Sequence, residues 1–155
     1  MIVIAHNIRS LHNVGAIFRS AAAFGIEKLY LTGFTACPPR KEIAKVALGA
    51  ETLVSWEYSE DVANIIQELH ADGYMVYALE TTPDAGQLSS IIRVKCALVL
   101  GNEVEGIDSA TLALCDAAVE IPMAKKRSLN VSVAAGIAMY AGSREKGAGP
   151  DSAVL

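Results

Sequence analysis

Short apolar runs alternate with segments of helical periodicity along most of the chain, and this alternation constrains the fold more than any other feature. The run at 96–101, "CALVLG", is apolar almost throughout, as in a strand that is buried on both faces. Strands that alternate with helices predict an α/β domain with a mainly parallel sheet and helices on both faces. The predicted strands cover residues 2–6, 28–33, 53–58, 74–80, 96–101 and 117–122.

Helical spacing of apolar residues and nearby capping residues predict the helices between these strands. Asn13 and Ser59 are expected to cap two of them, Gly25 and Gly73 to end them, and Asn130 to cap the last. We expect a single domain over residues 1–146 and a loose tail over 147–155, because no second domain or repeat is visible. The predicted helices cover 13–25, part of 38–51, 59–73, 109–115 and a segment that begins near Asn130.

Composition excludes several classes of protein. Hydrophobic residues make up 52% and charged residues 19% of the 155 residues, so a large core is possible and disorder is not expected. No apolar run is long enough for a membrane span, and the N-terminus resembles a strand rather than a secretion signal. Cys37, Cys96 and Cys115 make no metal-ligand spacing with the three histidines. We therefore expect free thiols, a cytoplasmic protein and no metal site.

A net charge of −4 argues against a protein that binds nucleic acid over its whole surface. The basic residues nevertheless cluster at 9–19, 40–45 and 125–127. These clusters indicate local patches for phosphates, or alternatively a solvated surface with chance groupings.

In parallel sheets, ligands bind in the loops beyond the carboxyl ends of the strands. Here these loops cover 6–13, 33–40, 80–88, 101–107 and 122–130. None carries a glycine-lysine phosphate loop, a dinucleotide fingerprint or a GxSxG elbow, which argues against kinases, dehydrogenases and serine hydrolases.

Three of these loops are unusually polar. The first leads into a helix where Arg19 shares a face with Gly15 and small alanines, an arrangement that suits a phosphate, or else an ordinary surface arginine. The second, "LGNEVEG" (100–106), places Gly101, Glu103 and Glu105 after the buried strand, although an ordinary α/β turn can look the same. The third, "IPMAKKRSLNVS" (121–132), carries more polar groups than a helix cap alone requires, although Asn130 can serve as that cap.

Together these loops resemble the SpoU family of RNA ribose methyltransferases, in the SPOUT class. The resemblance covers almost the whole chain and rests on three segments in the family's order, with "PPRKEIAKVALGAE" (38–51) as a fourth similar stretch. One loop differs from the family: "AKKR" (124–127) is shorter than usual and lacks the usual glycine. The three segments are "NVGAIFRSAAAFG" (13–25), "LVLGNEVEGI" (98–107) and "IPM…SLNVSVA" (121–134).

The resemblance implies a deep C-terminal trefoil knot, a bent S-adenosylmethionine bound by the knot loops, and a homodimer with active sites at its interface. The implied reaction is methylation of a ribose 2′-hydroxyl in tRNA or rRNA, with tRNA slightly favoured. Two alternatives stay open: a non-catalytic RNA-binding protein on the same fold, and a different small-ligand enzyme such as a nucleotide-binding hydrolase.

The resemblance also implies roles for individual residues. The implied catalytic residues are Asn13, Arg19, Glu103, Ser128 and Asn130. The implied cofactor-binding residues are Leu79, Glu80, Gly101, Ile121, Met123, Ser128 and Leu129. Local basic residues are expected to hold RNA: Arg9, Arg40, Lys41, Lys45, Lys125, Lys126 and Arg127.

Arg19 matches the residue proposed as the base in this family, yet a guanidinium with a pKa above about 12 gives up its proton only at high cost. Our hypothesis is that Arg19 binds the adjacent phosphate and stabilises the developing oxyanion, while Ser128, Asn130 or a water relays the proton. On the last helix, Ala134, Ala138 and Gly142 are spaced for close helix packing, either between subunits or within one.

Overall fold

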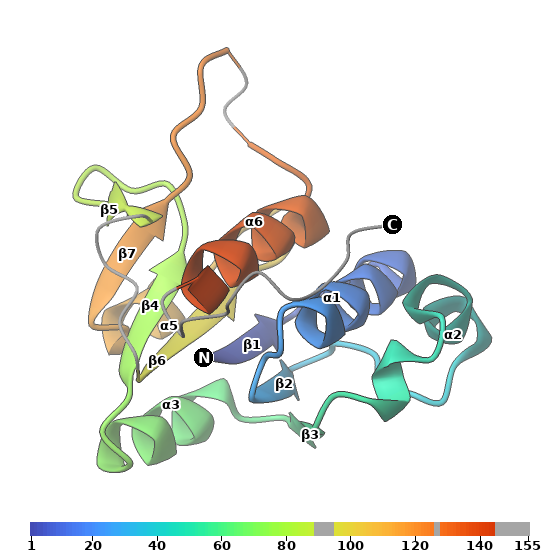
Figure 1. The fold of residues 1–155 in the computed structure, drawn as a ribbon. Helices are drawn as coiled ribbons and strands as arrows, with labels where there is room; N and C mark the ends of the chain where they lie inside the picture. The colour runs from blue at the N-terminus through green and yellow to red at the C-terminus, as the bar shows by residue number, and fades with distance from the viewer. Residues whose placement is uncertain (89–94, 126–127, 145–155) are drawn as a thin grey trace.

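The computed structural model describes residues 1–88, 95–125 and 128–144 (Figure 1). In this part of the chain the strands form one seven-stranded sheet in the order β3-β2-β1-β6-β4-β7-β5, and every neighbouring pair is parallel. The predicted parallel α/β architecture is confirmed. The strands are β1 (Ile2–His6), β2 (Lys28–Thr32), β3 (Trp56–Ser59), β4 (Met75–Leu79), β5 (Gly86–Gln87), β6 (Cys96–Leu100) and β7 (Ala117–Glu120).

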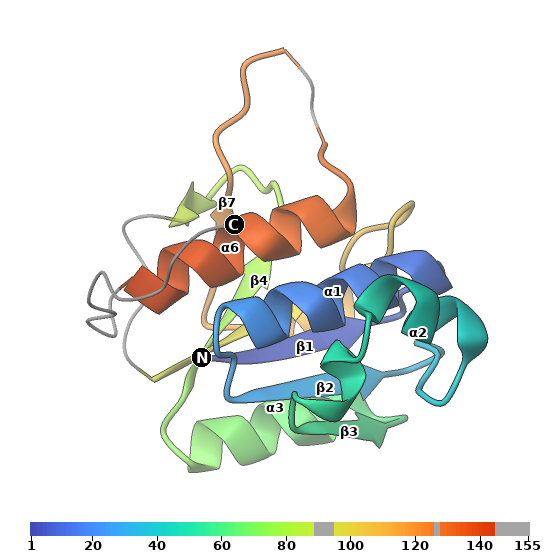
Figure 2. The ribbon, with the colours of Figure 1, turned by 45° about the vertical axis from the view of Figure 1, so that its right-hand side comes forward.

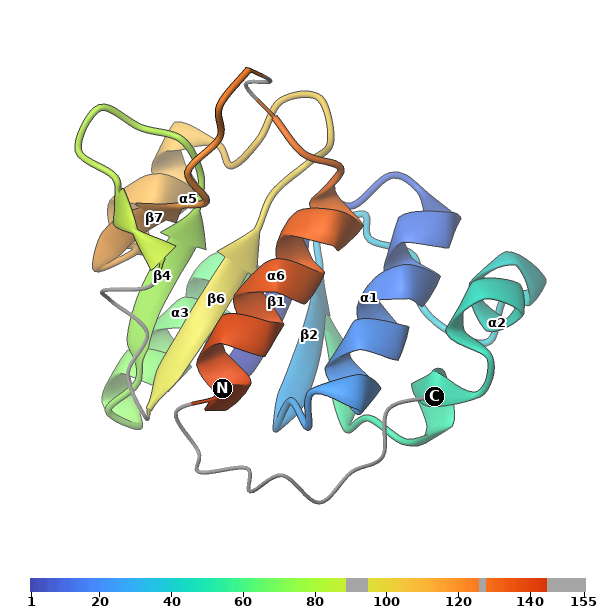
Figure 3. The same cartoon turned by 45° about the horizontal axis from the view of Figure 1, so that its top comes forward.

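Helices cover both faces of the sheet, as predicted. Figure 2 shows β1 and β2 between α1 on one side and α3 on the other, and Figure 3 shows α6 and α1 side by side over one face with α2 beyond α1. A short 3-10 helix, η1 (Ala50–Thr52), follows α2. The helices are α1 (Leu11–Ala23), α2 (Lys41–Ala47), α3 (Val62–Ala71), α5 (Ser109–Leu114) and α6 (Val131–Arg144).

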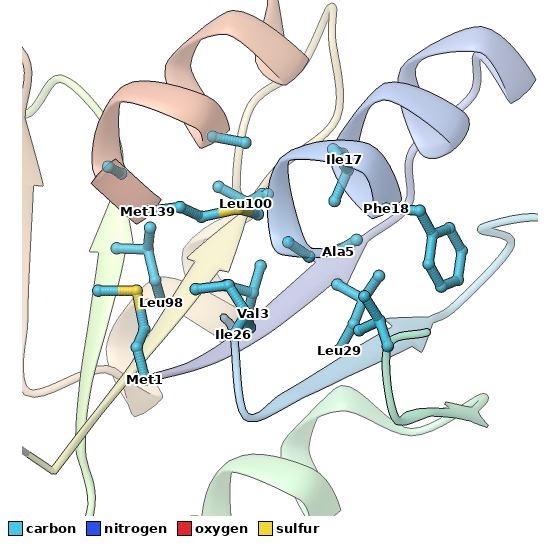
Figure 4. Close-up of a cluster of buried hydrophobic side chains, with 14 of the residues drawn as sticks. Met1, Val3, Ala5, Ile17, Phe18, Ile26, Leu29, Leu98, Leu100 and Met139 are labelled. Atoms are coloured by element: carbon cyan, nitrogen blue, oxygen red, sulfur yellow. The ribbon is translucent and has the colours of Figure 1, made fainter. Parts of the chain in front are cut away.

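The hydrophobic core has two parts, one on each side of the sheet. Successive side chains of a strand point to opposite faces, so Val3 and Ala5 of β1 join the cluster under α1 and α6, whereas Ile2 and Ile4 join the cluster under α3. Figure 4 shows the first cluster, in which Phe18 of α1 belongs to the same buried group. Burial on both faces explains why β6 is apolar throughout and why β1 is apolar up to its last residue, His6.

Two predicted helix caps were wrong by a few residues. The cap of α1 is Ser10, whose hydroxyl accepts the N–H of Asn13 at 3.3 Å, so Asn13 lies inside the first turn. The cap of α3 is Asp61 rather than Ser59, because its carboxylate accepts the N–H groups of Ala63 and Asn64. In both cases another polar residue near the predicted one has the extended backbone and the reach that a cap needs.

Two strand predictions also differ from the structure. β3 begins at Trp56 rather than at Leu53, because the chain is still leaving η1 at that point. The predicted loop at 80–88 contains β5, a two-residue strand that pairs with β7. So short a strand carries no periodicity of its own, and its pairing partner lies far along the sequence.

The small residues in the second half of α6 pack within the subunit, whereas Ala134, near its start, is half-buried. Ala138 is fully buried and Gly142 is buried, and α6 packs beside α1, where an added side-chain carbon on Gly136 would lie 3.4 Å from the Ser20 hydroxyl. The exposed side of α6 is instead apolar, with Val133, Ile137 and Tyr140 between 40% and 50% exposed. We call these three residues the α6 stripe.

Among the described helices, none is long and apolar enough to cross a membrane. The predicted tail at 147–155 lies outside the described residues. The single-domain boundary and the trefoil knot stay predictions.

Candidate functional site

A cavity of about 220 Å³ opens where the loops after β4, β6 and β7 meet the start of α6. This is the carboxyl edge of the parallel sheet, where ligands of such folds bind. Every residue that the resemblance assigns to the cofactor lines this cavity: Leu79, Glu80, Gly101, Ile121, Met123, Ser128 and Leu129. Their role in binding a cofactor stays a prediction.

Several lining residues were missed by the sequence analysis. Glu120 directly precedes Ile121 at the end of β7, and Asn102 directly follows Gly101. Thr81 follows Glu80 at the end of β4. Their position immediately beside assigned residues, at the ends of predicted strands, was the signal that could have identified them.

The loop after β6 folds back tightly on itself. Asn102 and Gly106 exchange two backbone hydrogen bonds of 2.9 and 3.0 Å, and Gly106 has a φ of +71°, which favours glycine. A side-chain carbon on Gly101 would lie 2.5 Å from the carbonyl carbon of Gly106, so only glycine fits there. Glu80 fixes the loop to β4, because its carboxylate accepts the N–H of Ile107 at 3.1 Å and that of Thr81 at 3.0 Å.

Glu103 connects this loop to the beginning of α1. Its carboxylate accepts the backbone N–H groups of Arg9 (2.9 Å) and Ser10 (3.0 Å) and the side-chain amide of Asn13 (2.9 Å). Partial burial alone would raise the pKa of Glu103, but these donors outweigh it and hold the pKa below its usual value. We therefore interpret Glu103 as an ionised positioning residue for the first loop.

Asn13 in turn connects to α6. Its side-chain oxygen accepts the amide of Asn130 at 3.2 Å. The Asn130 oxygen accepts the N–H of Ser132 at 2.9 Å and its hydroxyl at 2.6 Å, so Asn130 caps α6 as predicted. We call the linked side chains Glu103, Asn13 and Asn130 the carboxylate–amide chain.

Arg19 is the one predicted catalytic residue that the structure keeps apart from the others. Ser128 and Glu103 line the cavity, and Asn13 and Asn130 join Glu103 in the carboxylate–amide chain. Arg19 is exposed on α1, about 9 Å further along the helix axis than Asn13 at 1.5 Å per residue, and does not line the cavity.

The described basic residues predicted to hold RNA are exposed: Arg9, Arg40, Lys41, Lys45 and Lys125. Lys126 and Arg127, predicted for the same role, lie outside the described residues. Over the ranges that the structure describes, no group of three or more His, Cys, Asp or Glu side chains could hold a metal ion.

Comparison with known proteins decides the family. The model of the SpoU rRNA Methylase family matches residues 1–140. The chain belongs to this family.

Three similar proteins illustrate the relationship. The chain is 30% identical to the 23S rRNA (guanosine-2'-O-)-methyltransferase RlmB of Xanthomonas axonopodis, over 94% of this chain and 59% of that protein. It is 26% identical to an AdoMet-bound rRNA methyltransferase from Sinorhizobium meliloti, with a TM-score of 0.86 over 93% of this chain and 56% of that one. A structure described as concerning 2-OH methylation of C/U34 on tRNA is 25% identical, with a TM-score of 0.83 over 94% and 95% of the two chains.

The chain thus spans somewhat more than half the length of the RlmB relative. The fold and the family are shared along nearly the whole of this chain.

Proposed function

We propose that this chain is an S-adenosylmethionine-dependent RNA methyltransferase that methylates a ribose 2′-hydroxyl of tRNA or rRNA. The observation that carries the proposal is the carboxylate–amide chain beside the cavity. It brings the three family segments, far apart in the sequence, to one place at the carboxyl edge of the sheet. tRNA is slightly favoured, because the tRNA-related structure matches over nearly the full length of both chains.

The cavity lining suits the cofactor. Leu79, Leu100 and Ile121 offer apolar surface for an adenosine group. Glu80 and Glu120 also line this cavity, and their negative charge favours a cationic ligand. When bound, S-adenosylmethionine supplies an electrophilic methyl group on a sulfonium, and the protein contributes positioning and electrostatics.

The polar residues at the rim position the ribose. Asn130, held by Asn13 and by its cap bonds to Ser132, presents a fixed amide beside the cavity. The Ser128 hydroxyl lines the cavity and can donate to or accept from the ribose hydroxyl. Ser128, Asn130 or a water relays the proton that the hydroxyl loses.

In this proposal Arg19 acts at the cavity of a second copy of the chain, because it does not line the cavity of its own. It is exposed on α1, beside the helix that carries the apolar α6 stripe of Val133, Ile137 and Tyr140. A homodimer that buries this stripe would bring α1 of one subunit towards the site of its partner. Arg19 then binds a phosphate next to the target ribose and stabilises the developing oxyanion.

Local basic residues hold the RNA in this proposal, since the net charge of −4 opposes a general attraction. Arg9 lies in the first loop, which Glu103 holds through the Arg9 backbone N–H, and Lys125 precedes the polar segment that begins at Ser128. Contacts of this kind position an RNA without reading its sequence. Cytoplasmic location stays a prediction.

A non-catalytic RNA-binding protein is the alternative. Such a protein would need the basic surface but not a linked set of polar side chains beside the cavity. Here Asn13, Glu103 and Asn130 are all present and hydrogen-bonded in series. We therefore favour the enzyme.

Two measurements test the proposal. Isothermal titration calorimetry with S-adenosylmethionine and, separately, with ATP should show binding of the former only; binding of ATP alone would overturn the proposal. Mapping of ribose methylation in RNA from cells with and without the gene should reveal one or a few sites that depend on it. Cofactor binding without any such site would support the non-catalytic alternative.

A further inference from the structure

A buried histidine lies at the end of β1, outside the cavity. His6 is 7% exposed, and both of its ring nitrogens face polar side chains. Nδ1 lies 2.9 Å from the Thr32 hydroxyl, and Nε2 lies 2.9 Å from the side-chain nitrogen of Asn7. The Asp108 carboxylate lies 3.6 Å from Nε2.

The contacts of Asn7 determine which ring nitrogen of His6 carries the proton. The Asn7 side-chain oxygen accepts the N–H of Phe34 at 3.1 Å, which leaves its amide nitrogen facing the ring. An amide nitrogen only donates, so Nε2 must offer a lone pair. The ring proton therefore sits on Nδ1 and is donated to Thr32, and this tautomer follows from the hydrogen-bond network.

Asn7 transmits the state of this ring to the cavity wall. Its backbone has a φ of +56°, a left-handed conformation that needs support from its surroundings. Its carbonyl accepts the side-chain amide of Asn102 at 2.9 Å. The side-chain oxygen of Asn102 accepts the N–H groups of Val104 (2.8 Å) and Glu105 (3.1 Å), and both Asn102 and Val104 line the cavity.

We propose that His6 is a positioning residue for the cofactor cavity, and that its protonation loosens the wall at residues 102–105. A proton on Nε2 replaces the acceptor for Asn7 with a second donor. Asn7 cannot turn its amide over without losing Phe34, so the ring moves towards Asp108 and the support of Asn7 is lost. Cofactor affinity then falls on acidification.

The charges around the ring set the pH at which this occurs. Burial lowers the pKa of His6 below its usual value, and the nearby Asp108 partly opposes this. Asp108, the cap of α5, is the charged group that faces the ring within the described residues, since β2 contributes neutral Thr32 and the first loop contributes neutral Asn7. Because the pKa is lowered in the folded protein, the contact is still intact at the usual histidine value of 6.5 and is lost only as the pH falls through the lower folded value.

The inference rests on the proposed function only for the identity of the ligand. The test is NMR titration of the unliganded protein between about pH 5 and 8, following the His6 ring nitrogens and the amides of Val104 and Glu105. The Nδ1–H tautomer and a common midpoint for all three residues are expected. An Nε2–H tautomer, or wall amides that do not titrate with the ring, would overturn the inference even if no cofactor binds.

Two variants connect this titration to binding. In wild type, affinity for S-adenosylmethionine should fall roughly two- to tenfold across the His6 transition, the loss expected for one hydrogen bond. Asp108→Asn keeps a good helix cap but removes the charge that raises the pKa of His6. The fall in affinity on acidification, which we call the acid limb, should therefore move to lower pH. His6→Gln should have no such limb.

An acid limb that is unchanged in Asp108→Asn, or that persists in His6→Gln, would contradict the inference. If His6→Gln does not fold, Asp108→Asn and the wild-type titration decide the question alone. If no S-adenosylmethionine binds at any pH, the proposed cofactor is wrong, while the NMR titration still tests His6.

Discussion

The side-chain amide of Asn130 donates to the side-chain oxygen of Asn13 at 3.2 Å, which joins the beginnings of α6 and α1 across 117 positions of sequence. The Asn130 oxygen at the same time caps α6 through the N–H of Ser132. One side chain thus serves both as a helix cap and as part of the site, and substitution can separate the two roles.

Asn130→Ser should retain the cap but lose the amide that contacts Asn13. We expect its thermal stability to stay close to wild type while methyl transfer to RNA falls strongly. Asn130→Ala removes both roles and should also cost about 1 kcal/mol of the free energy of unfolding. Near-normal methyl transfer by Asn130→Ser would mean that Asn130 is only a cap.

Glu103→Gln should destabilise the first loop, because an amide cannot accept from all the donors that face Glu103. The expected loss is about 1–2 kcal/mol in chemical denaturation at neutral pH. The pKa of Glu103 is lowered in the folded protein, so its contribution is present above the usual value of 4.5 and is lost as the pH falls through the lower folded value. Denaturation curves at a series of pH values should therefore show a weaker acid dependence in Glu103→Gln.

Glu105→Gln is the matched control, since Glu105 is exposed two residues further along the same loop. It should leave both stability and its acid dependence close to wild type. Equal effects of the two substitutions would contradict the positioning role of Glu103.

Arg19→Lys tests how Arg19 acts. Lysine retains the charge but cannot form two parallel hydrogen bonds to a phosphate. We expect methyl transfer to fall well below wild type, with S-adenosylmethionine affinity unchanged, in single-turnover kinetics and calorimetry. Arg19→Ala provides the baseline, and near-full activity of Arg19→Lys would exclude a role that depends on the guanidinium fork.

Ile137→Glu should prevent dimerisation if the α6 stripe is the interface. Ile137 is 40% exposed in one chain, and a buried unpaired carboxylate would be costly in a dimer. Sedimentation velocity should show a monomer for this variant and a dimer for wild type. Leu53→Glu is the control, because Leu53 is 79% exposed next to η1 and away from α6; a wild-type monomer would refute the interface.

Gly15→Ala should destabilise the packing of α1 on α2. An added carbon would lie 2.6 Å from the carbonyl oxygen of Ile43, so α2 would have to move, at a cost of about 1–3 kcal/mol. Gly136→Ala is the helical counterpart, because its nearest neighbour, the Ser20 hydroxyl, would be 3.4 Å away. Thermal unfolding should show a lower midpoint for Gly15→Ala and little change or a small gain for Gly136→Ala.

Local sequence patterns were enough to predict the parallel architecture and the edge of the sheet at which the cavity lies. Apolar runs that alternate with helical periods require a parallel sheet covered on both faces, and the carboxyl ends of its strands must meet at one edge. That rule and the family segments together identified Gly101, Ile121 and Leu129, and the structure places all three around one cavity. These features depend on short-range patterns that a sequence displays directly.

Which side chains meet could not be predicted in this way, because it depends on the three-dimensional arrangement of the strands. Glu103 contacts Asn13 across 90 positions, and His6 lies beside Asp108, the cap of α5. Such pairs depend on the order of the strands in the sheet, which local periodicity does not encode. β1 lies between β2, its next neighbour in the sequence, and β6, which is far from it in the sequence. Arg19 does not line the cavity of its own chain, whereas Asn130, expected both as a cap and as a site residue, bonds Asn13 beside Glu103.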